Sequence, residues 1–488
     1  MLHNISWSVL ANVYRAILQI VLNLALAWFL APLDYGLVAL VLPVTVFVLL
    51  IGEFGLSAAI IRTKELSQFQ LDAAASFCLA CGAAIFLIVL LFYVAGGLVP
   101  LRHPLADLSL GFASVVMIAM SGIVPKAILE RNLEYGKLAL IETLAATTSC
   151  AIAIVAASFG AGVWTFLIYH LVLQMLRAAG FWKETEHKLK LTRRWSGVRD
   201  LLRFGGWVLA FNVVNYSARN FDNYIVASIL GTTALGIYAL AYQIMLIPLM
   251  TITWPVSGVL MSVLSKVKTE SSRVADIFLG VVTLVSLITL PAMSCVVVEG
   301  QLAIQFFLPQ HWQAVSLPVS HLAVAGALQS LTSLVGVLFV IKGRVRQQFQ
   351  LGMILTAITL VTVTIVASMQ GTIVGVVNAY VALTLVFTVL YAGIAVRLLH
   401  TSYEKLLQAV MPAGLAVIIS LFMSFALLSF VPSARNTGAE LVISAFAFGF
   451  GLATIIFIYQ GNLRTTLNQL RATSVELSGQ NKLETVST

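Results

Sequence analysis

The sequence predicts an all-α integral membrane protein with about fourteen transmembrane helices, arranged as two pseudo-symmetric six-helix lobes around a central cavity plus two C-terminal helices. Three observations predict this fold: an apolar composition, an internal repeat and a one-sided distribution of basic residues. Of 488 residues, 60% are hydrophobic and only 10% are charged, and the mean hydropathy is +1.00. Values this high lie outside the range of soluble domains.

Transmembrane helices are expected wherever about 20 consecutive residues are predominantly apolar, because that length crosses the hydrocarbon core. The apolar windows are long and show no strand alternation. This favours helices over barrel strands, since only a helix satisfies all of its backbone groups within one segment. In chain order, the predicted spans cover about residues 8–31, 36–60, 72–99, 106–128, 138–160, 162–181, 204–230, 235–263, 276–298, 313–341, 348–369, 371–396, 406–431 and 440–460.

An internal repeat divides the chain into related halves. The segment from Trp7 to Ser57 recurs 200 residues later. Related membrane halves around a shared polar interior are typical of secondary transporters, in which parallel repeats are one of two known arrangements. The residues that match at this offset are Trp7 with Trp207, Asn12 with Asn212, Asn23 with Asn223, Gly36 with Gly236, and Ala39-Leu40 with Ala239-Leu240.

The repeat and the polar segments together predict the domain organisation. The linker between the halves is too polar to cross a bilayer, and its basic residues suit an anionic cytoplasmic surface. We expect an N-terminal six-helix lobe over residues 1–182, a basic cytoplasmic linker over 183–203, a C-terminal six-helix lobe over 204–400, two additional transmembrane helices over 401–462 and a polar cytoplasmic tail over 463–488.

Basic residues predict the orientation. With a cytoplasmic N-terminus, all of the 28 Lys and Arg residues fall on the cytoplasmic side except Arg15, Arg102, Arg219 and Arg435. This bias satisfies the positive-inside rule and places both termini in the cytoplasm. Topology therefore accounts for most of the net charge of +9, and without an aromatic-basic platform that charge does not predict nucleic-acid binding.

Polar residues form one stripe on the first helix of each repeat, because they are spaced three or four residues apart. We expect the stripes to face a hydrated cavity, since buried charge in a membrane helix turns toward a partner or toward water. Arginine suits phosphate because its planar fork donates two hydrogen bonds and stays charged. The predicted substrate-binding residues are Asn12, Arg15, Gln19, Asn212, Asn215 and Arg219.

Two acidic residues inside the spans, Glu53 and Asp222, are predicted to be coupling groups for a proton or sodium gradient, or counter-ions of the arginines. Structural alternatives remain open for each charged position. Asp222 can pair with Arg219, which lies three residues away on the same helix. Arg15 can extend to the cytoplasmic headgroups or pair with Glu53.

No metal site and no cofactor are predicted. Cys78 and Cys81 form a CxxC motif without a second thiol pair, and Cys150 and Cys295 also lie within apolar spans. An enzyme is not expected, because the outer loops are short and nearly free of paired catalytic groups.

Four segments carry a family resemblance: Phe54–Arg62, Leu129–Tyr135, Leu202–Trp207 and Leu235–Tyr242. In this order and spacing they make the chain similar to the Wzx-type polysaccharide transporter family, in particular its colanic-acid exporter branch. One departure is Ser262, at a position where relatives often carry a proline.

The resemblance implies a flippase of the multidrug/oligosaccharidyl-lipid/polysaccharide superfamily. Such a protein moves undecaprenyl-diphosphate-linked repeat units of the exopolysaccharide, O-antigen or capsule type from the inner to the outer leaflet of the bacterial plasma (inner) membrane, by alternating access. In related flippases cavity arginines contact the diphosphate, and Arg15 and Arg219 correspond to them by position. The implied partners are the lipid-linked oligosaccharide, membrane lipids and polysaccharide assembly proteins. The alternative is a cation-coupled drug or small-molecule antiporter of the same superfamily, which would need a more acidic cavity.

Overall fold

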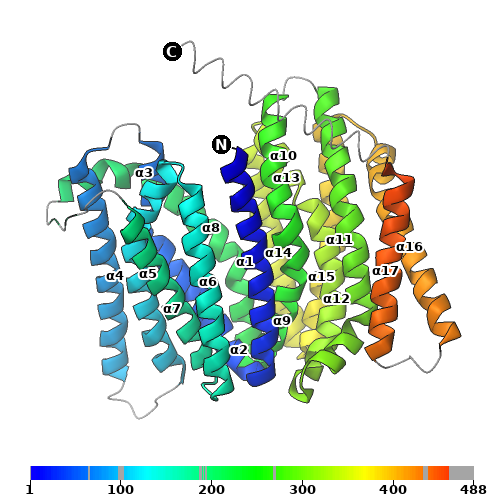
Figure 1. Cartoon of the computed structure of the whole chain (residues 1–488), viewed down its shortest axis with the longest axis horizontal. Coiled ribbons are helices and arrows are strands. Elements are labelled where there is room, and N and C mark those ends of the chain that lie inside the picture. Colours follow the sequence, from blue (N-terminus) through cyan, green and yellow to red (C-terminus); the bar gives the residue numbers. More distant parts are fainter. Residues whose placement is uncertain are drawn as a thin grey trace. The chain divides into compact units, whose positions relative to one another are not determined.

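A computed structural model describes residues 2–63, 66–96, 104–185, 190, 192, 195–267, 271–431 and 438–460. These residues form helices and short connections and contain no strand, so the all-α prediction is confirmed (Figure 1). The α-helices are α1 (Leu2–Phe29), α2 (Pro32–Glu53), α3 (Leu56–Arg62), α4 (Gln68–Gly96), α5 (Pro104–Arg131), α6 (Tyr135–Ser158), α7 (Trp164–Glu184), α8 (Arg199–Leu230), α9 (Thr232–Pro248), α10 (Trp254–Lys266), α11 (Ser271–Phe307), α12 (Ser316–Thr332), α13 (Val335–Ile341), α14 (Val345–Gln370), α15 (Ile373–Leu399), α16 (Tyr403–Phe430) and α17 (Gly438–Ile458).

The chain is a multi-pass membrane protein. Within the described residues, eleven helical segments are long and apolar enough to cross a membrane, and Tyr14–Phe29 is a shorter apolar helix. The remaining predicted spans correspond to α1, α7 and α8. The count of about fourteen spans therefore stays a prediction.

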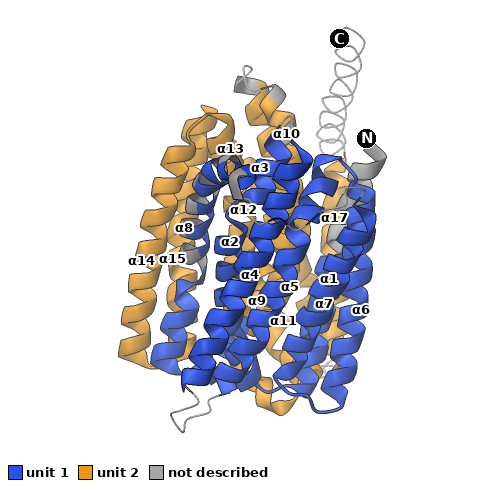
Figure 2. Cartoon of the chain, turned by 90° about the vertical axis from the view of Figure 1, so that its left-hand side faces the viewer, with its two compact units in different colours: residues 1–239 blue, residues 240–488 orange. Residues whose placement is uncertain are grey.

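Two compact units divide the chain, residues 1–239 (unit 1) and 240–488 (unit 2), coloured blue and orange in Figure 2. In unit 1, α1 packs on α6, and α5 packs on both α4 and α7. In unit 2, α11 packs on α12 and α16, and α16 packs on α17. The two C-terminal helices therefore belong to the packed body of unit 2. The lobe boundaries at residues 182 and 204 stay a prediction.

Several of the predicted spans are interrupted. The span predicted over 36–60 breaks after α2, where Phe54 and Gly55 adopt left-handed backbone conformations with φ of 51° and 67°. The break lets α8 approach closely, since a Cβ atom added at Gly205 would lie 2.2 Å from the carbonyl oxygen of Phe54. In the second repeat, a π-helical segment over Leu249–Thr253 separates α9 from α10. Glu53 and Thr253 match at the 200-residue offset, so both copies of the helix are interrupted at the same place.

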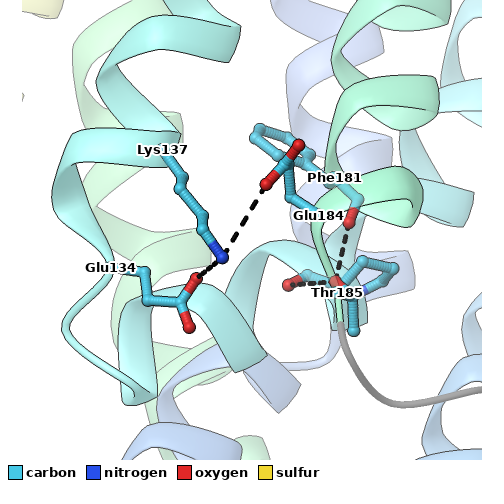
Figure 3. Close-up of polar contacts among 6 residues, drawn as sticks. Glu134, Lys137, Phe181, Glu184 and Thr185 are labelled. Atoms are coloured by element: carbon cyan, nitrogen blue, oxygen red, sulfur yellow. Dashed lines mark hydrogen bonds and ion pairs between the residues drawn. The ribbon is translucent and has the colours of Figure 1, made fainter.

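A polar cluster joins the start of α6 to the end of α7 (Figure 3). The Nζ atom of Lys137 lies 2.8 Å from Glu134 Oε2 and 3.7 Å from Glu184 Oε2. Beside it, the Thr185 hydroxyl donates to the carbonyl oxygen of Phe181 at 2.6 Å and closes the last turn of α7. The first turn of α6 and the last turn of α7 are thus level with each other.

A candidate polar site on α1, α6 and α7

The polar stripe of α1 contacts the neighbouring helices of unit 1. Arg15 forms an ion pair with Glu142 of α6, and the two side chains are 22% and 14% exposed. The residue before Arg15 also contacts α6, since the hydroxyls of Tyr14 and Thr147 lie 3.0 Å apart. The acidic partner of Arg15 is therefore a residue that the sequence analysis did not single out.

The next residues of the stripe face α7. The Gln19 side-chain amide donates to Asn23 Oδ1 at 3.3 Å, and its Oε1 atom accepts a hydrogen bond from the Tyr169 hydroxyl at 3.1 Å. The structure thus brings Arg15 and Gln19 together, as the spacing on α1 predicts, and adds partners from two other helices of the same unit.

Arg177 of α7 is a second arginine of this region. It is close enough to Arg15 and Tyr169 for electrostatic interaction, and its Nε atom is buried without a hydrogen-bond partner. Glu142 and Arg177 both lie inside windows that the sequence predicts to span the membrane, where one charged side chain costs at least about 2.5 kcal/mol. Their charge was the signal that could have identified them.

The corresponding stripe of the second repeat is described only in part. Asn212 is half-buried on α8. The structure does not describe the side chains of three other predicted site residues: Asn12 on α1, and Asn215 and Arg219 on α8. Asp222 accepts a hydrogen bond from the hydroxyl of Tyr238 at 3.1 Å. The pairing of Asp222 with Arg219 therefore stays a prediction, and Tyr238 is a partner that the spacing did not indicate.

Glu53 is half-buried at the end of α2. Among the residues that the structure describes, it has no hydrogen bond or ion pair, and it is close enough to the buried Cys78 of α4 for electrostatic interaction. Its predicted role as a counter-ion or coupling group stays a prediction. The described residues contain no group of three or more His, Cys, Asp and Glu side chains that could hold a metal ion.

A buried carboxyl of unit 2 was missed because it lies just beyond the predicted span 276–298. Glu299 of α11 is 7% exposed, and its Oε1 atom accepts a hydrogen bond from the Ser444 hydroxyl at 2.6 Å. The Ser444 and Ser424 hydroxyls are 2.8 Å apart. This chain of polar contacts joins α11 to both C-terminal helices.

Comparisons with known proteins agree with this architecture. Residues 25–317 match the model of a family described as "Polysaccharide biosynthesis protein". The "Lipopolysaccharide biosynthesis protein WzxC" of Escherichia coli (strain K12) is 25% identical over 402 residues, 82% of each chain. The "Teichuronic acid biosynthesis protein TuaB" of Bacillus subtilis (strain 168) is 26% identical over 305 residues, 62% of each chain.

Among solved structures, the inward closed conformation of the lipid II flippase MurJ superposes with a TM-score of 0.72. The match covers 93% of this chain and 98% of that one, at 13% sequence identity. At such low identity the likeness shows the fold alone. It confirms the all-α membrane-protein fold that the sequence predicts.

Proposed function

Because this chain belongs to the polysaccharide biosynthesis protein family, we propose that it is a flippase for undecaprenyl-diphosphate-linked polysaccharide repeat units. It moves them from the inner to the outer leaflet of the bacterial plasma membrane by alternating access, and no bond is made or broken. The observation that carries the proposal is the similarity to WzxC over 82% of each chain. Both termini are cytoplasmic in this proposal, since the basic residues then satisfy the positive-inside rule.

The charges on α1, α6 and α7 support an anionic substrate over a cationic drug. Arg15 and Lys126 of α5 both contact Glu142, which lies 3.9 Å from the Nζ atom of Lys126. Arg177 is close enough to Arg15 for electrostatic interaction. A cation-coupled antiporter for cationic drugs would need an excess of carboxylates at its binding site. The excess of guanidinium groups suits a diphosphate instead.

In this proposal Arg15 and Arg219, one from each copy of the repeat, bind the diphosphate. Asn12, Gln19, Asn212 and Asn215 lie on the same helix faces and contact the polar headgroup. Since Arg15 is paired with Glu142 in this structure, the incoming phosphate has to replace that carboxylate. Glu53 and Asp222 are the candidates for coupling to a proton or sodium gradient. Polysaccharide assembly proteins are the partners that would supply or receive the repeat unit.

Deleting the gene and identifying the lipid-linked glycan that accumulates tests the proposal and names the cargo. In the complemented strain, Arg219→Ala lowers export at a normal protein level. Arg219→Lys recovers only part of it, because the bidentate geometry is lost. Arg397→Ala, which removes an exposed arginine of α15, is the matched control and leaves export unchanged. Accumulation of no lipid-linked glycan in the deletion strain would contradict the flippase proposal.

A further inference from the structure

Arg177 carries a positive charge that no ion pair among the described residues neutralises. Its Nε atom is buried without a hydrogen-bond partner. No carboxylate among the described residues forms an ion pair with it, whereas Arg15, Lys126 and Lys137 each contact one. A guanidinium inside a membrane protein is stable only with an anion or water at hand, so the buried Nε atom of Arg177 is a donor available to an anionic ligand.

Arg177 and Glu142 lie at the same depth. Glu142 is seven residues after the start of α6 at Tyr135, and Arg177 is seven residues before the end of α7 at Glu184. Those two helix ends are joined through Lys137, as Figure 3 shows. At 1.5 Å per residue, both side chains are anchored about 10 Å along their helices from this joined end. Arg15 is at this level too, because it pairs with Glu142.

The charges at this level do not balance. Arg15 and Lys126 both contact Glu142, and Arg177 is close enough to Arg15 for electrostatic interaction. Within the part of the chain that the structure describes, the further carboxylate that pairs with these cations is Glu130, 3.6 Å from Lys126. One positive charge is left over among these described residues. Lys126 is 42% exposed, so the cluster reaches the surface of the protein at this end.

We infer that Arg177 and Arg15 form an anion-binding site within unit 1 for a phosphate-bearing lipid headgroup. Two guanidinium groups can each donate a pair of parallel hydrogen bonds to phosphate oxygens. The phosphate displaces Glu142 from Arg15, and Lys126, 3.9 Å from Glu142, receives the released carboxylate. The phosphate belongs either to the diphosphate of a lipid-linked sugar or to a membrane phospholipid. Only the first of these sources rests on the proposed function.

Binding of inorganic pyrophosphate to the purified full-length chain in detergent tests the site. Arg177→Ala weakens pyrophosphate binding about tenfold or more, the loss expected for one charge-assisted contact. Arg177→Lys keeps the charge but not the fork, and gives an intermediate affinity. Arg397→Ala is the matched control and binds as the wild type does. Each variant is first checked for an unchanged elution profile and unfolding temperature, and if Arg177→Ala is unstable, the Lys variant carries the comparison.

Competition identifies the source of the phosphate. Displacement of pyrophosphate by undecaprenyl diphosphate assigns the site to the lipid-linked substrate, and displacement by phosphatidylglycerol alone assigns it to a membrane phospholipid. Either result supports the site. A wild-type chain that binds no pyrophosphate, or a folded Arg177→Ala variant that binds it as tightly as the wild type, overturns the inference. A chain that binds pyrophosphate through Arg177 but flips no lipid would overturn the proposed function and leave this site intact.

Discussion

Gly36 of α2 and Gly236 of α9 pack against each other's helices with reciprocal geometry. A Cβ atom added at Gly36 would lie 1.8 Å from the carbonyl oxygen of Thr232, and one added at Gly236 would lie 1.8 Å from that of Pro32. Gly36 and Gly236 match at the 200-residue offset of the repeat, and so do Pro32 and Thr232. The two copies therefore meet at equivalent backbone positions, where only glycine permits the approach.

Gly36→Ala should force the two helices apart, because the atom that the new methyl group meets is backbone and cannot rotate away. We expect a loss of about 1–3 kcal/mol in the free energy of unfolding, read as a lower midpoint of thermal unfolding. Gly414→Ala on α16 is the control, since a Cβ atom there meets nothing within 4 Å. An unchanged midpoint in Gly36→Ala would contradict the close crossing.

The Arg15–Glu142 pair gives a second prediction. Glu142→Gln leaves Arg15 without its carboxylate, and we expect a loss of about 2 kcal/mol, since the two side chains are mostly buried. The double variant Arg15→Gln/Glu142→Gln should recover part of this loss because position 15 no longer carries a charge without its counter-ion. Glu134→Gln, in the more exposed pair with Lys137, is the control and should cost about 0.5 kcal/mol. Thermal unfolding of the wild type, the two single variants Arg15→Gln and Glu142→Gln, and the double variant measures the coupling, and strictly additive losses would rule the pair out.

Arg15 shows which part of the polar site could be predicted from the sequence: its polar environment, but not its partner. An arginine within an apolar helix signals a polar environment from composition alone, and the same reasoning applied to Glu142 and Arg177 would have found all three charges. Which of them meet depends on how α1 packs on α6 and α7, and the partners Arg15 and Glu142 are 127 residues apart. Periodicity predicts which residues share one face of a helix, but not which other helix packs against that face.

The interrupted helices show a second limit. Hydropathy over residues 36–60 is continuous because Phe54 and Gly55 do not lower it, yet the backbone turns there with positive φ. The turn coincides with the close approach of Gly205 from α8. Such a contact between distant segments leaves no periodic signal, whereas the fold class and the repeat depend on long patterns and could be predicted.

Ser444→Ala tests how the C-terminal helices are held. The variant removes the hydrogen bond to Glu299, a carboxyl that is 7% exposed, and we expect a loss of about 1–3 kcal/mol. Ser330→Ala is a matched control, since Ser330 is equally buried but donates only to Gly326 of its own helix. The unfolding temperatures of both variants measure the difference. A Ser330→Ala loss as large as that of Ser444→Ala would show that the contact does not hold α17.

Cysteine labelling tests the orientation on a background without the four native cysteines. A single cysteine in place of Arg344, between α13 and α14, should react with a membrane-impermeant maleimide only from the cytoplasmic side. One in place of Phe159, which is 87% exposed between α6 and α7, should react only from outside. Both expectations follow from a cytoplasmic N-terminus and the helix order. A reversal at both positions would invert the topology.

Of the two coupling candidates, Asp222 allows the more specific test, because its hydrogen-bond partner, Tyr238, is known. Asp222→Asn keeps an oxygen that can accept a hydrogen bond from the Tyr238 hydroxyl, but the amide cannot ionise and so cannot carry a proton across the membrane. If Asp222 carries the driving proton, its ionised form must be costly in one state and stabilised in the other. Asp222→Asn should then abolish flipping driven by a pH gradient imposed across proteoliposomes, and leave equilibrium binding of the lipid-linked diphosphate unchanged.

Tyr238→Phe separates the carboxyl from its hydrogen bond. This variant loses the 3.1 Å contact but keeps the proton-exchanging group, so gradient-driven flipping should persist at a reduced rate. Glu53→Gln tests the other candidate in the same assay. If Asp222→Asn/Glu53→Gln still flips lipid in proportion to the gradient, neither carboxyl couples transport. Asp222 would then be the hydrogen-bond acceptor that holds Tyr238 against α8, and its effect would appear as a lower unfolding temperature rather than as lost coupling.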